Sequence, residues 1–219
     1  MIKEYKYIEE LFEKIKKEID EPVTLYVIGG AVLLYQELKP ATKDTDIIVE
    51  TRKEFLAIQK ALTKIGFKPQ IPGKEYERMN LNQIYKKDDA QIDLFEKEVC
   101  KKFSLTNGMK QRAKQIHNYK NLKIKHCSNE DIFLFKTMTE RDGDLEDCKS
   151  LSRTELDWEE ILKELQSQIQ KSKQDVWITW VGERLDILEQ DGMIIPIMPQ
   201  IDELRLKYFE DLEKTQNTR

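Results

Sequence analysis

The spacing of apolar residues changes along the chain and separates a mixed first part from a helical second part. Apolar residues at helical spacing between Ile2 and Ile19 predict an amphipathic helix. The near-continuous apolar run Val23 to Ile28 predicts a strand covered on both faces, and Asp46 to Glu50 reads as a second strand. Further strands are expected over these segments: Leu81 to Tyr85, Ala90 to Phe95, Phe103 to Met109 and Leu122 to His126.

Helices are expected between these strands and throughout the remainder of the chain. Ala31 to Leu38, Arg52 to Ile65 and a segment near Lys110 to Lys114 read as helices, whereas Phe67 to Asn80 reads as irregular. After Cys127 the pattern is helical, with helices opening at Ser128 and at three later segments: Trp158 to Lys171, Val176 to Glu189 and Ile201 to Leu212. We therefore predict an α+β protein with a mixed-sheet domain over residues 1–127 and a helical domain over residues 128–219.

The first strand is followed by a glycine turn, and the second strand opens on two acids. Gly29 and Gly30 follow Ile28 directly, and Asp44-Thr45-Asp46 leads into the second strand. Residues two apart on a strand point to the same face, so Asp44 and Asp46 are expected to converge and Thr45 to face the other way. Two convergent carboxylates favour a hard cation such as Mg²⁺. Alternatively, the glycines are a tight turn and Asp44 a simple cap.

A third acid lies on the strand that returns from the hairpin near Lys86 to Asp89. Asp93 stands between Ile92 and Leu94, on a strand expected to lie beside the Asp44/Asp46 strand. An isolated aspartate in an alternating strand is commonly just solvent-facing. Its position beside the acid pair favours a functional role.

The glycine pair, helix and Asp-x-Asp strand together resemble the signature of the nucleotidyltransferase superfamily, which has a polymerase-β-like fold. The resemblance implies that Gly29 and Gly30 lie at the nucleotide phosphates, that Asp44 and Asp46 hold catalytic Mg²⁺ or Mn²⁺, and that Asp93 is the third catalytic acid. It runs from about Val23 to Leu151.

The start of the helical half carries charged residues among apolar ones. Lys136, Arg141, Asp144 and Asp147 follow Phe133 and Phe135, and buried charges are uncommon unless paired or liganded. One interpretation is a salt-bridged helix pair. The other is that Lys136 reaches the nucleotide phosphates while the acids orient it.

The same stretch resembles a motif of abortive-infection type nucleotidyltransferase toxins and of related uncharacterised prokaryotic proteins, prominent in archaea. This resemblance implies that Lys136 and Arg141 bind nucleotide and that Asp144 and Asp147 support them. The toxin pattern usually has an Arg or Ser-rich element before its Asp-x-Asp. This chain has Pro-Ala-Thr-Lys there, so Lys43 is the substitute we expect at the nucleotide.

Composition limits the location and the partners. The net charge is −4 with 36% charged residues, and neither a signal peptide nor a run long enough to cross a membrane is apparent. Three cysteines without metal-type spacing predict free thiols and a cytoplasmic protein. A basic run beside the expected site is either a solvated face or an RNA footprint: Lys101, Lys102, Lys110, Arg112, Lys114, Lys120, Lys123 and Lys125.

The sequence therefore predicts a cytoplasmic, metal-dependent transferase that moves NMP from an NTP such as ATP to an acceptor hydroxyl. Family analogy favours tRNA or another RNA as the acceptor, with a protein hydroxyl next, and a cognate antitoxin as a partner. The alternatives are a small-molecule nucleotidyltransferase and a non-catalytic regulatory module that retains the fold. The presence of all three acids argues against the last.

Overall fold

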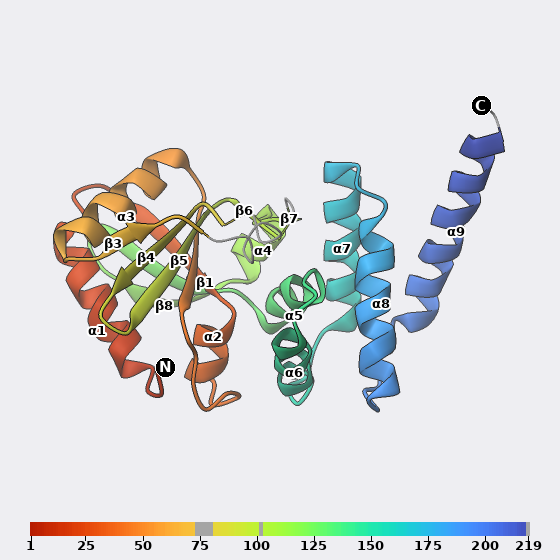
Figure 1. Cartoon of the computed structure of the whole chain (residues 1–219), viewed down its shortest axis with the longest axis horizontal. Helices are drawn as coiled ribbons and strands as arrows, with labels where there is room; N and C mark the ends of the chain where they lie inside the picture. Colours follow the sequence, from red (N-terminus) through yellow and green to blue (C-terminus); the bar gives the residue numbers. More distant parts are fainter. Residues whose placement is uncertain (73–80, 101–102, 218–219) are drawn as a thin grey trace. The chain divides into compact units, whose positions relative to one another are not determined.

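The computed structural model describes residues 1–72, 81–100 and 103–217 of the chain. The chain forms two compact units, Met1–Ser128 and Asn129–Arg219. The first holds the strands and the second is helical (Figure 1). The predicted α+β class, with a mixed sheet followed by a helical half, is confirmed.

A seven-stranded mixed sheet organises the described part of the first unit, with the order β3-β4-β5-β2-β1-β9-β8. Two central neighbours, β2 and β5, are parallel, and β2 is antiparallel to β1. The strands are β1 Val23–Ile28, β2 Thr45–Val49, β3 Lys68–Gln70, β4 Gln83–Lys87, β5 Ala90–Glu96, β8 Lys114–Asn118 and β9 Leu122–His126. A separate short hairpin pairs β6 Glu98–Val99 with β7 Phe103–Ser104.

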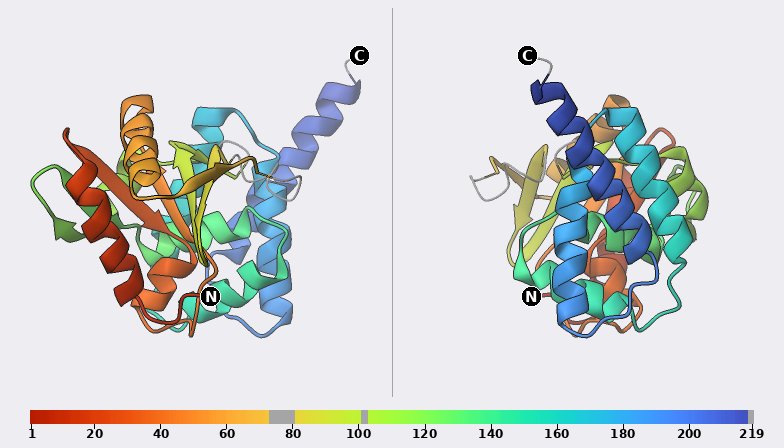
Figure 2. Two further views of the ribbon diagram at one scale, coloured as in Figure 1. Left: turned by 60° about the vertical axis from the view of Figure 1, so that its left-hand side comes forward. Right: turned by 90° about the vertical axis from the view of Figure 1, so that its right-hand side faces the viewer.

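Four α-helices of this unit join or cover the strands. They are α1 Lys6–Ile15, which continues into the 3₁₀ turn η1 Lys16–Glu18, α2 Gly30–Tyr35, α3 Arg52–Lys64 and α4 Asn107–Arg112 within the described residues. Apolar residues on one side of α1 and α3, including Phe12 and Ile58, are fully buried. Figure 2 shows both helices beside the strands (red and orange). Amphipathic periodicity thus places these two helices against the sheet.

The first turn of α3 is hydrogen-bonded to β1 and to the residue that follows β2. Thr51 and Glu54 form a capping box at this end. Glu54 also accepts a hydrogen bond from the backbone N–H of Thr24 on β1 at 3.1 Å and one from the N–H of Glu50, just after β2, at 3.1 Å. One carboxylate therefore joins the helix to β1 and to the end of β2.

The second unit consists of α5 Asn129–Thr137, α6 Asp142–Leu151, α7 Trp158–Ser172, α8 Trp177–Gln190 and α9 Met198–Asn217 among its described residues. Trp177 and Leu165 are buried in its core, and Trp158 contacts Phe133 edge-on. Buried positions of α9 are Met198 and Ile201, at its beginning. Figure 2 shows the later turns of α9 extending past α7 and α8. No helix within the described residues is long and apolar enough to cross a membrane.

Several element boundaries differ from the sequence prediction for local reasons. The first helix begins at Lys6, because Ile2 is instead bridged to Thr42. Lys68–Gln70 forms an edge strand although Phe67 to Asn80 was expected to be irregular, since Pro69 is tolerated at a sheet edge. Residues 73–80 of that segment lie outside the described residues.

Two further strand predictions were incomplete. The segment expected as a strand over Phe103 to Met109 is a two-residue strand followed by α4, which Thr106 caps. The edge strand β8, Lys114–Asn118, was missed because its polar sequence carries no alternating signal. The helix that opens near Ser128 ends at Thr137, and a second helix, α6, begins at Asp142 and includes Gly143.

Replacing Thr51 with Ala should lower the free energy of unfolding by about 1 kcal/mol, because the first turn of α3 loses its capping oxygen. Thr63→Ala is the matched control, since this exposed hydroxyl bonds only a carbonyl of its own helix. Urea unfolding of both variants measures the difference. Equal stability of Thr51→Ala and Thr63→Ala would contradict the anchoring role of the cap.

Candidate functional site

Asp46 and Asp93 lie side by side on neighbouring strands. The parallel pairing of β2 with β5 sets Asp46 directly opposite Asp93. Partner residues on adjacent strands point to the same face, with the strands about 4.8 Å apart. Asp46 is half-buried and Asp93 is 1% exposed. The structure thus brings together two of the three predicted acids.

Asp44 and Lys43 precede the strand and do not belong to it. The first residue of β2 is Thr45, and Asp44 is half-buried while Lys43 is exposed. The Asp44 carbonyl accepts a hydrogen bond from Thr42 Oγ1 at 3.1 Å. We expected Asp44 and Asp46 to converge because both would lie on one strand. Only Asp46 lies in β2, so strand alternation does not place Asp44 on the same face.

Gly29 brings the backbone against the Asp46 carboxylate. Ile28, the last residue of β1, pairs with Asp46, and Gly29 follows with φ 66° and ψ −146°, a region that is essentially restricted to glycine. A Cβ on Gly29 would lie 2.6 Å from Asp46 Oδ2. A Cβ on Gly30 would collide with Thr42 Oγ1. Both glycines are therefore required by close packing around the turn.

Gln91 is a site residue that the sequence analysis missed. Its Nε2 donates a hydrogen bond to Asp93 Oδ1 at 2.8 Å. The signal was available, because Gln91 stands two residues before Asp93 on the same strand and so shares its face. Gln91 fixes the orientation of a carboxylate that is almost fully buried.

The donor set fits a hard cation held partly by substrate. Asp46 and Asp93 supply oxygen ligands on one face, and Gly29, which has no side chain, lets the backbone lie against the Asp46 carboxylate. Among the described residues, no three His, Cys, Asp or Glu side chains gather into a metal-binding group. Mg²⁺ commonly binds through one or two carboxylates together with substrate phosphates. The pair therefore suits a metal that arrives with a nucleotide.

The predicted residues of the helical half form an ion-pair network within the second unit. Lys136 Nζ lies 2.6 Å from Asp144 Oδ1 and 2.8 Å from Asp147 Oδ2. Arg141 Nε lies 2.7 Å from Asp144 Oδ2, and Thr139 also donates to Asp144. These contacts join the end of α5 to α6, as the salt-bridge interpretation predicted.

Burial and charge act in opposite directions in this network. Burial alone would raise the pKa of Asp144, but the charges and hydrogen bonds of Lys136 and Arg141 outweigh it and lower the pKa to about 2. Burial likewise disfavours the charged form of Lys136, yet Asp144 and Asp147 raise its pKa above the ordinary value. Both groups are therefore charged at neutral pH.

Arg184 of α8 extends the network and was also missed. One terminal nitrogen of its guanidinium donates to the Arg141 carbonyl at 2.9 Å, and its Nε is buried and has no hydrogen-bond partner among the residues that the structure describes. The Arg141 side chain is 53% exposed, whereas that of Lys136 is only 11% exposed. No sequence motif surrounds Arg184, so only the fold brings it to Arg141.

The basic run is distributed over the outer strands of the sheet and the helix before them. Lys114 on β8 and Lys123 on β9 are exposed. Lys110 of α4 is instead paired with Glu50 at 2.5 Å. Lys101 and Lys102 lie outside the described residues. Lys114 and Lys123 therefore remain exposed at the β8–β9 edge, and the register, which pairs Lys114 with His126, sets them on opposite faces of the sheet.

The chain is similar to a known family and to solved structures. Residues 5–180 match a family model described as a nucleotidyltransferase of unknown function, DUF6036. The chain is similar to a solution structure of the antibiotic-resistance factor ANT(2″)-Ia, with a TM-score of 0.51, 11% identity, and 77% of this chain and 94% of that chain covered. At this identity the likeness concerns the fold. No curated protein matches the chain by sequence.

A second structure, a crystal structure of ANT(2″)-Ia in complex with adenylyl-2″-tobramycin, gives a TM-score of 0.48 and 12% identity. That match covers 74% of this chain and 97% of the other. At this TM-score the likeness supports no conclusion about this chain. The family match confirms the nucleotidyltransferase resemblance read from the sequence.

Replacing Lys136 with Met should lower the free energy of unfolding by about 3–5 kcal/mol at pH 7, because two buried carboxylates lose their shared ammonium group. The control Lys149→Met removes a lysine that pairs with Glu146 and Asp191 at the surface, and should cost under about 1 kcal/mol. Denaturant unfolding compares the two. A loss no larger than that of Lys149→Met would show that the network does not stabilise the unit.

The stabilisation from Asp144 should disappear in acid. Its folded-state pKa of about 2 is below the ordinary value of 3.8, so the contribution is present above about pH 4 and is lost as the pH falls towards 2. We expect Asp144→Asn to be less stable than wild type by roughly 2 kcal/mol at pH 6 and by much less near pH 2. A pH-independent difference, measured by chemical denaturation, would contradict the pairing.

Proposed function

The chain belongs to the nucleotidyltransferase family DUF6036, and from this we propose that it transfers NMP from an NTP such as ATP to an acceptor hydroxyl at the Asp46–Asp93 pair. A nucleotidyltransferase is a phosphorus-group transferase of the EC 2.7.7 type. The observation that carries the proposal is the β2–β5 register, which places two carboxylates together beside the Gly29 turn.

Asp46, Asp93 and Asp44 are the proposed metal ligands. Mg²⁺ or Mn²⁺ held there with the nucleotide would supply charge stabilisation at the attacking and leaving oxygens. Asp93, held by Gln91 and nearly fully buried, would complete the metal site that activates the acceptor hydroxyl. Asp44 precedes the strand. The alternation of side chains along β2, which sets the direction of Asp46, therefore does not set the direction of the Asp44 carboxylate.

Gly29 and Gly30 are proposed to admit the nucleotide phosphates. Without side chains the backbone can approach an anion closely. The Gly29 backbone lies against the Asp46 carboxylate, so a phosphate bound at this turn would be a neighbour of a metal-binding oxygen. Lys43, exposed immediately before the acids, is the proposed cation of this unit.

The helical unit, residues 128–219, is proposed to contribute Lys136 and Arg141 to nucleotide binding, with Asp144 and Asp147 in support. The ion pairs hold Lys136 in one position and keep it charged. Arg141 has more than half of its side chain exposed and is thus the more accessible donor to a phosphate.

We propose an RNA acceptor, with tRNA as the first to test and a protein hydroxyl next. The support is the exposed lysines of the β8–β9 edge, which suit a polyanion. The three cysteines are free thiols, which agrees with the cytoplasmic location we propose. A cognate antitoxin remains a proposal from the toxin resemblance. A small-molecule acceptor is the alternative.

Replacing Asp46 with Asn should abolish transfer while leaving the fold intact, because the amide removes a metal-binding charge without changing shape. Purified protein is incubated with Mg²⁺, each α-labelled NTP in turn, and total tRNA, an aminoglycoside or no acceptor. Asp93→Asn should behave in the same way. Asp20→Asn, at an exposed position, is the matched control and should transfer normally.

Label on tRNA would support the RNA acceptor, label on the protein itself would favour a protein hydroxyl, and label on the aminoglycoside would favour the small-molecule alternative. Transfer by Asp46→Asn at the wild-type rate would contradict the assignment of the site. Absence of both transfer and NTP binding in the wild type would favour the non-catalytic alternative.

A further inference from the structure

The last helix, α9, carries a row of exposed apolar side chains. Leu206, Phe209 and Leu212 are 62%, 49% and 39% exposed. Residues three apart are neighbours on a helix surface, so these three form one continuous row, the α9 row. The helix packs into the second unit at its beginning, where Met198 and Ile201 are buried, and its later turns extend past α7 and α8 (Figure 2).

Phe209 lies at the middle of the α9 row, and its neighbour holds its ring in place. The ring contacts that of Tyr208 edge-on, with the ring centroids 5.3 Å apart. Tyr208 is half-buried and lines a groove together with Ile169 of α7 and Ile178 of α8. An aromatic side chain that is already held loses little freedom on binding, so Phe209 suits the centre of an interface.

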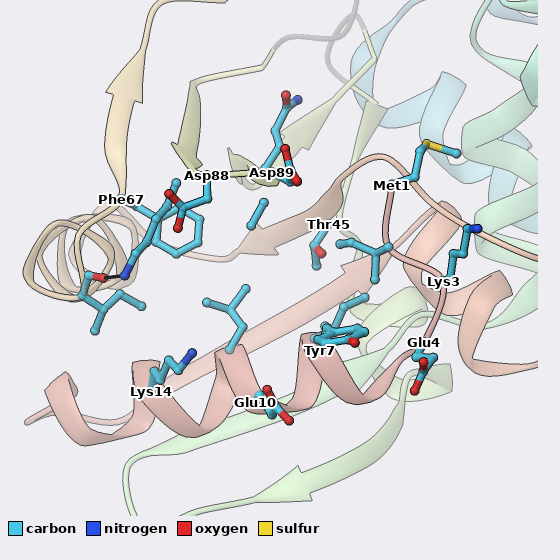
Figure 3. A pocket seen from close by; sticks show the side chains of 17 residues that line it. Met1, Lys3, Glu4, Tyr7, Glu10, Lys14, Thr45, Phe67, Asp88 and Asp89 are labelled. Carbon is cyan, nitrogen blue, oxygen red and sulfur yellow. Dashed lines mark hydrogen bonds between the residues drawn. The ribbon is translucent and has the colours of Figure 1, made fainter.

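An exposed apolar residue of the first unit has a different setting. Tyr7 of α1 lines a cavity of about 580 Å³ in that unit. Figure 3 shows Tyr7 there with the charged side chains Lys3, Glu4 and Glu10 nearby. The α9 row differs because its three apolar side chains follow one another without a charged residue between them on the helix surface. A continuous apolar surface of this kind indicates an interaction site.

The sequence around Phe209 has a two-fold symmetric pattern. Leu206 and Leu212 stand three residues before and after it, and Arg205 and Glu213 stand four residues before and after it. Positions three and four residues away share the helix face of Phe209. Two such helices can pair antiparallel about a two-fold axis at Phe209. Each Leu206 then meets a Leu212. Each Arg205 meets a Glu213, which carries the opposite charge. The pattern therefore complements itself, as an isologous interface requires.

The positive charge beside the α9 row is held in position. Arg205 Nη1 lies 2.9 Å from Asp186 Oδ2 and 3.2 Å from Asp202 Oδ1, and the side chain stays partly exposed. Glu213, on the other side of Phe209, is exposed. Ion pairs at the rim of an interface select its orientation and register more than they add affinity.

The charge of α9 disfavours an anionic partner. Acidic residues outnumber basic ones in this helix: Asp202, Glu203, Glu210, Asp211 and Glu213 against Arg205, Lys207 and Lys214. Helices that lie on membranes and surfaces that bind RNA are instead rich in Lys and Arg. A partner protein of unrelated sequence would require no symmetry about Phe209, whereas a second copy of the chain requires it.

We propose that a second copy of this chain covers the α9 row, and that the two α9 helices pack antiparallel about a two-fold axis at Phe209. The two Phe209 side chains face each other at the centre, with a Leu206–Leu212 contact on either side. The dimer joins the second units of two copies and uses none of the residues proposed for transfer. Asp46→Asn should therefore dimerise as wild type does.

Sedimentation analysis over a range of concentrations tests the dimer. Wild type should be dimeric at about 100 µM, because three apolar side chains from each copy form a small interface. Phe209→Glu places a charge at the axis and should weaken dimerisation at least about tenfold. Leu56→Glu is the matched control, since Leu56 of α3 is 47% exposed, and should dimerise as wild type does.

Disulfide cross-linking tests the register. Facing Cα atoms of two packed helices lie about 5 Å apart, within reach of a disulfide. Phe209→Cys should therefore cross-link to its own copy on oxidation. Leu206→Cys alone and Leu212→Cys alone should not, since equivalent residues lie roughly 9 Å apart along the helix axis, but a mixture of these two variants should cross-link. The three native cysteines are buried and do not compete.

Three results would overturn the proposal. The first is a wild type that stays monomeric at the stated concentration. The second is a dimer that Phe209→Glu weakens no more than Leu56→Glu does. The third is a mixture of Leu206→Cys and Leu212→Cys that forms no cross-link. Loss of transfer in Asp46→Asn with an unchanged dimer would show that dimerisation and the proposed transfer are separate properties, as expected here.

Discussion

The register between β2 and β5 is the constraint on which the proposed site depends. It places Asp46 opposite Asp93, whereas a slip of one residue would turn either carboxylate to the other face. The register is supported by apolar neighbours on both strands, since Ile47 and Leu94, the next pair along, are fully buried. Hydrophobic packing of the sheet thus holds two carboxylates side by side, although like charges repel each other.

The glycine turn and the helical network solve different electrostatic problems. Gly29 lets the backbone pass close to the Asp46 carboxylate, where a side chain would collide with it. In the second unit Lys136 instead satisfies two carboxylates from within the protein, so that network is complete without a ligand. Asp144 and Asp147 therefore stabilise the second unit, and this role does not depend on whether Arg141 and Lys136 also contact nucleotide.

Much of this arrangement could be predicted from the sequence where patterns were strong. The apolar runs around Gly29 and after Asp44 gave the central strands, and the alternation around Asp93 gave its neighbour. Edge strands such as β8 were lost because polar residues fill them. Arg184 could not be found, since its contact with Arg141 joins helices far apart in the chain.

The central claim is that Asp46 and Asp93 hold a divalent metal together with a nucleotide. Electron paramagnetic resonance of Mn²⁺, titrated into the protein with a non-hydrolysable NTP analogue, tests this directly. The account predicts a bound-Mn²⁺ signal in wild type that requires the nucleotide and is lost in both Asp46→Asn and Asp93→Asn, while Asp20→Asn retains it. A bound signal of the same strength in Asp46→Asn would contradict the account, because the metal would then be held elsewhere.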